Sequence, residues 1–267
     1  MTEILNDQGK YETSLNTLKQ ALKLYNKHYE SDSIQVAKTL IRLGQVYNEL
    51  GNLEKATGCY SEGIKIFRLK TLERSADDNI FMSQAMGQLG KVYARKKMHG
   101  KAIELCTESL KIQKKYSSDE TISSVAQSCL VIADILSEWG KADQALQFFE
   151  EALRIYKENV GPESTQVATC YHGIGLAQKR MGDNKTAMMN FGKSLRINRG
   201  EEGDKSLPVA DDLFQIGQIY DSFLDKSKAF QCFQECLKIR QANLSDDDLD
   251  LLAARRYVDT LKRKLER

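Results

Sequence analysis

The side chains that could carry out chemistry are few and widely separated along the chain. The three histidines, His28, His99 and His172, lie far from one another, and none stands beside a Cys or a carboxylate at metal-ligand spacing. The six cysteines form no CxxC pair, and each lies within an apolar helical pattern. We therefore interpret them as buried apolar side chains in a reducing compartment. Cys232 and Cys236 are four residues apart and would share one helix face, but two thiolates do not complete a tetrahedral metal site.

Sequence motifs of known catalytic and nucleotide-binding sites are also missing. The sequence contains no HExxH, GxSxG, GxxxxGK[ST] or GxGxxG. Its Gly-Lys pairs, at 9–10, 100–101 and 140–141, lack the preceding Gly of a phosphate-binding loop. We therefore predict a protein that is not an enzyme and that holds no cofactor and no metal.

The charge balance argues against a polyanionic partner. Lys and Arg number 39 and Asp and Glu 37, so the net charge is +2 and no strong field attracts nucleic acid or an anionic membrane. No stretch approaches the ~18 apolar residues of a membrane span, and the first residues show no secretory signal. We expect a cytoplasmic protein, with association to the cytoskeleton or a cilium as an extension of that location, and neither nucleic acid binding nor membrane insertion.

An internal repeat organises most of the chain. Five segments align on one column of small residues, namely Gly44, Gly90, Ala133, Gly175 and Gly217, at intervals of 46, 43, 42 and 42 residues. Apolar residues one and four positions before the column have helical spacing, and an Ala twelve positions after it opens a second apolar periodicity. Each unit is therefore predicted to be a pair of helices.

Glycines mark both the helices and the turns of this repeat. A Gly inside a helix costs ~1 kcal/mol relative to Ala, so four in one column need a compensating contact. We predict that neighbouring helix pairs touch backbone to backbone there. Gly51, Gly140 and Gly182 fall at the turn between the two helices, where a positive φ is expected, and Lys97 and Leu224 stand at this place in the other units.

These residues resemble the tetratricopeptide repeat (TPR) over about residues 36–240. The mostly 42-residue interval exceeds the standard 34, and a Val-Ala pair opens the first helix at 36, 125, 167 and 209. The lengthened repeat is similar to those of kinesin light chains and nephrocystin-3-like proteins. The resemblance implies an all-α fold, a right-handed superhelical α-solenoid of stacked antiparallel helix pairs.

We expect one continuous array. Residues 1–30, with Gly9-Lys10 as the turn, form only the second helix of a partial repeat, and residues 245–267 form a capping helix. Five helix pairs lie between them, at about 31–76, 77–117, 118–160, 161–202 and 203–244. The partial repeat is either a shortened cap or the start of a piece cut from a longer protein, and we favour the piece. An uncapped end exposes apolar surface, which predicts self-association.

The TPR resemblance also implies that the first helices line a groove that binds a partner. Transferred onto this sequence, the groove residues are Lys38, Arg42, Gln45, Gln84, Gln88, Lys91, Arg95, Leu130, Val131, Asp134, His172, Leu176, Lys179, Phe214, Gln215 and Gln218. The groove is thus cationic and amide-rich at first, then apolar, then amide-rich again. We predict that it binds an extended or partly helical protein segment with acidic residues at one end.

The leading hypothesis is a non-catalytic interaction scaffold or adaptor. Two alternatives stay open. The chain is a structural subunit of a larger cytoskeletal or ciliary assembly, using the array ends or its convex face, or it is the regulatory TPR domain of a larger signalling protein.

Overall fold

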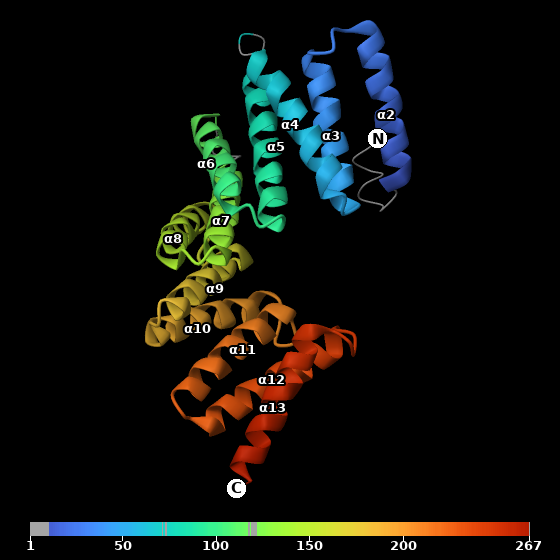
Figure 1. Cartoon of the computed structure of the whole chain (residues 1–267). Coiled ribbons are helices and arrows are strands. Elements are labelled where there is room, and N and C mark those ends of the chain that lie inside the picture. The colour runs from blue at the N-terminus through green and yellow to red at the C-terminus, as the bar shows by residue number, and fades with distance from the viewer. Residues whose placement is uncertain (1–10, 71, 73, 117, 119–121, 267) are drawn as a thin grey trace. The chain divides into compact units, whose positions relative to one another are not determined.

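A computed structural model describes residues 11–70, 72, 74–116, 118 and 122–266, and within them every regular element is a helix (Figure 1). The chain divides into two compact units, Met1–Trp139 and Gly140–Arg267. Unit 1 contains α2 (Tyr11–His28), α3 (Ile34–Glu49), α4 (Leu53–Leu69), α5 (Ala76–Arg95), α6 (His99–Tyr116) and α7 (Ile122–Glu138). Unit 2 contains α8 (Ala142–Asn159), α9 (Thr165–Arg180), α10 (Asn184–Glu201), α11 (Leu207–Ser222), α12 (Lys226–Asn243) and α13 (Leu249–Leu265). The Gly9-Lys10 turn expected near the N-terminus lies outside the described residues.

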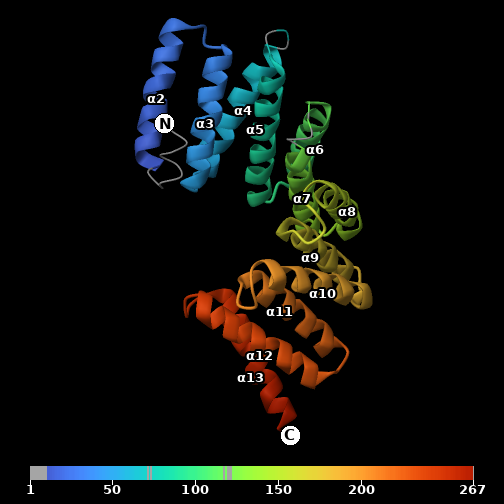
Figure 2. The same cartoon turned by 180° about the vertical axis from the view of Figure 1, so that it is seen from behind.

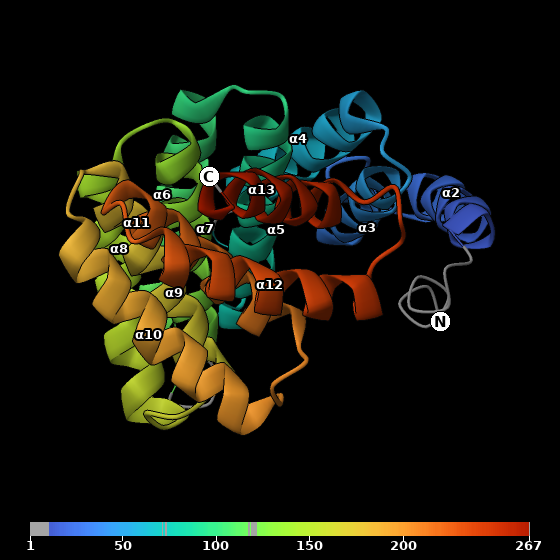
Figure 3. The same ribbon diagram turned by 90° about the horizontal axis from the view of Figure 1, so that it is seen from below.

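Helices adjacent in sequence pack against each other within each unit. The most extensive contacts join α3 to α4 and α5 to α6 in unit 1, and α9 to α10 and α11 to α12 in unit 2. Short turns reverse the chain within each of these pairs, so their helices are antiparallel. Figures 1 and 2 show α2 to α5 side by side, and Figure 3 shows α13 beside α12. The predicted all-α architecture of helix pairs is confirmed.

Turn geometry follows the sequence prediction. Gly51, Gly140 and Gly182 adopt φ values of 73°, 82° and 86°, a region that L side chains rarely enter. Lys97 and Leu224 adopt the same conformation, at φ 59° and 63°, without being glycine. The turn between the two helices therefore has the same backbone conformation in all five repeats, even where its residue is not glycine.

The small-residue column has a different physical basis from the one predicted. A Cβ added to Gly175 would lie 2.8 Å from the ring of Phe191, and one added to Gly217 would lie 3.0 Å from the ring of Phe233. Gly44 faces Tyr60 in the same way, at 3.0 Å. The predicted backbone contact between neighbouring pairs is wrong, because these glycines accommodate an aromatic ring from the second helix of their own pair.

Gly90 departs from this ring packing. Its pair carries Cys106 where the others carry an aromatic residue, and an added Cβ would overlap the Cys106 sulfur. It would also lie 3.2 Å from the carbonyl oxygen of Ala102, so here the helices do approach closely enough for backbone contact. The remaining member of the column, Ala133, is fully buried.

The buried cores consist of these rings and the aliphatic side chains around them. In unit 1, Tyr60, Phe67 and Met86 are among the buried residues of one cluster. In unit 2, Phe191 and Phe233 lie in neighbouring clusters along the helix pairs. Among the described helices, none has both the length and the apolar character that a membrane crossing requires.

Candidate peptide-binding cleft

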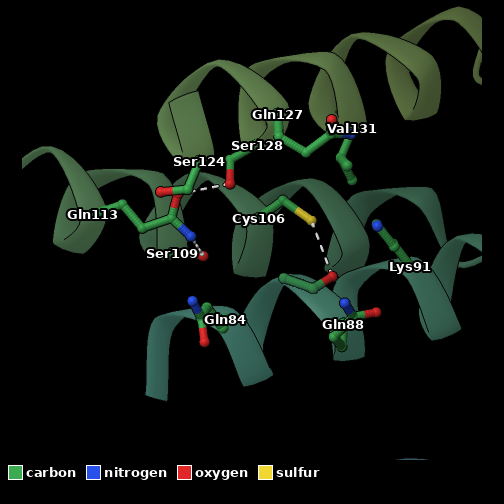
Figure 4. Close-up of a pocket in the computed structure, with 11 residues that line it drawn as sticks. Gln84, Gln88, Lys91, Cys106, Ser109, Gln113, Ser124, Gln127, Ser128 and Val131 are labelled. Carbon is green, nitrogen blue, oxygen red and sulfur yellow. Dashed lines mark hydrogen bonds between the residues drawn. The ribbon is translucent and has the colours of Figure 1, made fainter. Parts of the chain in front are cut away.

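An open cleft in unit 1 lies between α5 and α7, and residues of α6 line part of it. We define the α5–α7 cleft by eight residues, Gln84, Gln88, Lys91 and Arg95 on α5 and Gln127, Val131, Asp134 and Glu138 on α7. It comprises two adjoining cavities, of about 180 and about 550 Å³, which share Lys91, Gln127 and Val131. Figure 4 shows the smaller cavity, with α5, α6 and α7 each contributing side chains.

Helical periodicity places these residues on the cleft walls. On both helices the four positions are spaced by four, three and four residues, which aligns them along one face. The other side of α5 is buried, with Met82, Met86 and Leu89 each at most 3% exposed. The apolar stripe that fixes the helix in the core therefore also fixes the direction of the polar stripe.

The α5 wall carries polar groups that have no partner within the described part of the chain. The amides of Gln84 and Gln88 make no hydrogen bond there, and the ammonium of Lys91 makes no ion pair. Arg95 donates to the Asn48 side-chain oxygen, at 2.9 Å. The α7 wall carries the acids Asp134 and Glu138, and Glu138 Oε2 lies 3.8 Å from Lys97 Nζ.

The floor of the smaller cavity is a chain of hydrogen bonds. Ser109 Oγ donates to the Ser83 carbonyl oxygen at 2.6 Å, Gln113 Nε2 donates to Ser109 Oγ at 3.4 Å, and Ser128 Oγ donates to Gln113 Oε1 at 2.7 Å. Beside them, burial raises the pKa of the Cys106 thiol to about 11 despite the opposing charge of Lys91, so the thiol is protonated at neutral pH.

The sequence reasoning missed these floor residues because it considered only the first helix of each pair. A signal for them was present in the second helix. Ser109 follows Gly90 by nineteen residues and lies on the small-residue face of its helix, and the polar Gln113 follows four residues later on the same face.

The predicted groove residues on α3 contribute less free charge than expected. Lys38 Nζ lies 2.6 Å from Asp78 Oδ1. Burial tends to raise the pKa of Asp78, but hydrogen bonds from Lys38 and Ser75 outweigh it and hold the pKa below its usual value. Arg42 is exposed and Gln45 half-buried.

In unit 2 the predicted groove residues contact other side chains of the same unit. His172 Nδ1 lies 2.7 Å from Asp212 Oδ1. Lys179 donates to Gln215 Oε1 at 2.7 Å and also to Gln218 Oε1, and burial lowers its pKa. Leu176 is half-buried and packs against a cluster that includes Phe191.

Two side chains that were predicted as apolar anchors for a partner pack against other residues of the chain instead. Phe214 contacts the rings of Phe233 and Tyr257, with centroids 5.4 and 5.3 Å away, and the Arg240 guanidinium lies 4.8 Å from its centroid. The prediction that Leu130 lines the groove surface is wrong. Leu130 is 6% exposed, because the buried stripe of α7 is wide enough to include it beside Cys129.

Among the described residues, no group of three or more His, Cys, Asp or Glu side chains is arranged to hold a metal ion.

Comparison with known proteins agrees with the helix pairs. The family model of the tetratricopeptide repeat matches residues 3–68, 81–158, 123–199 and 167–242. The chain belongs to the tetratricopeptide repeat family. Its TPRs are of the long, kinesin light chain-like type that the 42-residue interval predicted.

Individual relatives support this type of TPR. Protein KINESIN LIGHT CHAIN-RELATED 1 of Arabidopsis thaliana is 25% identical over 140 residues, 52% of this chain and 22% of that protein. Protein KINESIN LIGHT CHAIN-RELATED 3 of the same plant is 29% identical over 133 residues, 48% of this chain and 20% of that protein. The matched TPR segment therefore spans about a fifth of these relatives. The crystal structure of BtubC (BKLC) from P. vanneervenii has a TM-score of 0.70 at 20% identity, covering 89% of this chain and 94% of its own, and shares the fold.

Proposed function

We propose that this TPR chain is a non-catalytic interaction scaffold or adaptor that binds a segment of a partner protein in the α5–α7 cleft. The observation that carries the proposal is a set of donors on α5, Gln84, Gln88 and Lys91, which have no partner among the described residues and line an open cavity. In unit 2, by contrast, His172 and Lys179 of α9 are paired with side chains of α11. A bound segment gains hydrogen bonds only where donors are still available.

The side chains on the cleft walls indicate what kind of partner segment would bind there. Side-chain amides donate to and accept from an extended main chain, so Gln84 and Gln88 suit a peptide backbone. Lys91 and Arg95 attract acidic side chains on the α5 wall. We therefore propose a partner segment that has acidic residues at one end. We also propose a cytoplasmic location, which the kinesin light chain-related relatives support.

The test uses peptides selected from a random display library on the full chain, with dissociation constants measured by fluorescence anisotropy. Lys91→Glu is expected to weaken the selected peptides at least about tenfold, a change of ~1.4 kcal/mol, and to reduce the salt dependence of binding. Lys111→Glu makes the same charge change on an exposed position of α6 outside the cleft and is expected to leave binding unchanged. Equal affinity of the two variants would refute the proposed site.

A further inference from the structure

The smaller cavity of the cleft has a counterpart at the equivalent place in unit 2. That counterpart has a volume of about 210 Å³ and includes His172, Ser194 and Asn198 in its lining. His172 precedes Gly175 by three residues as Gly87 precedes Gly90, and Asn198 and Gln113 each follow their column glycine by twenty-three. The two cavities thus lie at equivalent positions of the repeat but are lined by different residues.

In unit 2, the protein's own imidazole enters this place. His172 Nδ1 lies 2.7 Å from Oδ1 of Asp212, a fully buried carboxylate. Asn198 Nδ2 donates to Asp212 Oδ2 at 3.1 Å and to Ser194 Oγ at 3.2 Å, so both N–H groups of this amide are used. The polar groups at the floor are satisfied without a ligand.

In unit 1, the same place lacks that side chain. Gly87 stands where His172 stands, and Ser128 stands where Asp212 stands. Gln113 is 6% exposed, yet its Nε2 makes one long hydrogen bond to Ser109, and its second N–H has no partner among the described residues. Ser128 Oγ donates to Gln113 Oε1 and keeps its lone pairs for a donor.

We propose that this cavity is a socket for one neutral carboxamide side chain, Asn or Gln, of the segment bound in the cleft, an inference that rests on the proposed function. The carboxamide oxygen accepts from Gln113 Nε2, and its NH₂ group donates to Ser128 Oγ, so each unsatisfied group gains a complementary partner.

Size and charge both favour this occupant. The volume of about 180 Å³ is below the ~300–1,000 Å³ of sites for drug-sized ligands, which favours one side chain over a free small molecule. Among the described residues that line the cavity there is no carboxylate, and the one charged side chain of that lining, Lys91, lies at the opposite end from Gln113 (Figure 4). A carboxylate at the Gln113 end would lose its hydration without a charged partner, which is more costly than burying an amide.

The experiment uses the same selected peptides, with each position replaced in turn by Ala, Gln and Glu. In the wild-type chain, one Asn or Gln is expected to be required, with about a tenfold loss of affinity on replacement by Ala or Glu. Gly87→His places an imidazole in the unit 1 cavity at the position equivalent to His172. This variant is expected to weaken peptide binding about tenfold and to abolish the preference for Asn or Gln at that peptide position. Gly100→His introduces the same residue at an exposed site with no atom within 4 Å and serves as the control.

A second variant covers the case in which Gly87→His disturbs folding, which far-UV circular dichroism would show. Ser128→Ala removes the acceptor, together with the hydrogen bond that Ser128 Oγ donates to Gln113 Oε1, and is expected to reduce the carboxamide preference. If Lys91→Glu abolishes peptide binding while Gly87→His and Ser128→Ala leave it unchanged, the socket is wrong and the cleft proposal stands. A preference for Glu at the critical position also overturns the socket. If no peptide binds the wild-type chain, both proposals fail.

Discussion

Replacing Gly175 and Gly192 by Ala separates ring packing from helix propensity. Both glycines lie inside helices of unit 2, so each alanine gains ~1 kcal/mol from propensity. At Gly192 nothing lies within 4 Å of the new methyl group, so Gly192→Ala is expected to stabilise by about that amount. At Gly175 the methyl group would lie 2.8 Å from the ring of Phe191, which is fully buried.

Overpacking of this kind costs about 1–3 kcal/mol. Because the propensity gain is common to both variants, Gly175→Ala is expected to be about 1–3 kcal/mol less stable than Gly192→Ala. Urea unfolding followed by far-UV circular dichroism measures the difference, and a Phe191→Leu background should remove most of it. Equal stability of the two alanine variants, or a difference that persists without the ring, would refute the assignment of the glycine column to ring packing.

Three further perturbations test the turns and the ion pairs, each read by urea unfolding. Leu224→Gly should stabilise by about 1 kcal/mol, because φ is 63° and the side chain is 80% exposed, and an unchanged or lower stability would contradict strain at this turn. Asp78→Ala should lose about 1–2 kcal/mol at pH 7, since the hydrogen bonds that the Asp78 carboxylate accepts from Ser75 in the capping box and the Lys38 pair both disappear. The lowered pKa of Asp78 means that this contribution is present above the ordinary value of 3.8 and disappears as the pH falls further, so a loss that does not shrink below pH 3.8 would exclude the carboxylate as its source. Arg240→Met should lose about 2–3 kcal/mol, because this buried guanidinium donates to Asp211 and to the Asp250 carbonyl oxygen, each at 2.8 Å, and a loss under 1 kcal/mol would refute that role.

The periodic features of the fold were predictable from the sequence, because they depend on local spacing. The small-residue column located the helix pairs, and the turn glycines Gly51, Gly140 and Gly182 have the predicted positive φ. The α5 wall was predictable for the same reason. Positions 84, 88, 91 and 95 follow helical spacing opposite a buried apolar stripe, and the structure places them together along one cleft.

Contacts between helices were harder to predict than positions along them. Glycine in the column indicated a close contact but could not say whether a backbone or a ring fills the space, and the answer is the ring of Phe191 at Gly175. Leu130 and Phe214 occupy positions that face the groove in the family pattern, yet one is buried on a wide apolar face and the other packs against Phe233 and Tyr257. Neither outcome is encoded in the spacing of a single helix.

The amino-acid sequence by itself determined that the chain is a series of helix pairs and which face of each helix is polar, because backbone geometry repeats every 3.6 residues whatever surrounds it. Only the tertiary structure decided which polar faces remain available. A donor such as His172 or Lys179 is satisfied or left free by residues about forty positions away, and that depends on the packing of separate helices. The same repeat pattern therefore yields a site whose polar groups are paired with one another at His172, and a site with polar groups left available among the described residues at Gly87.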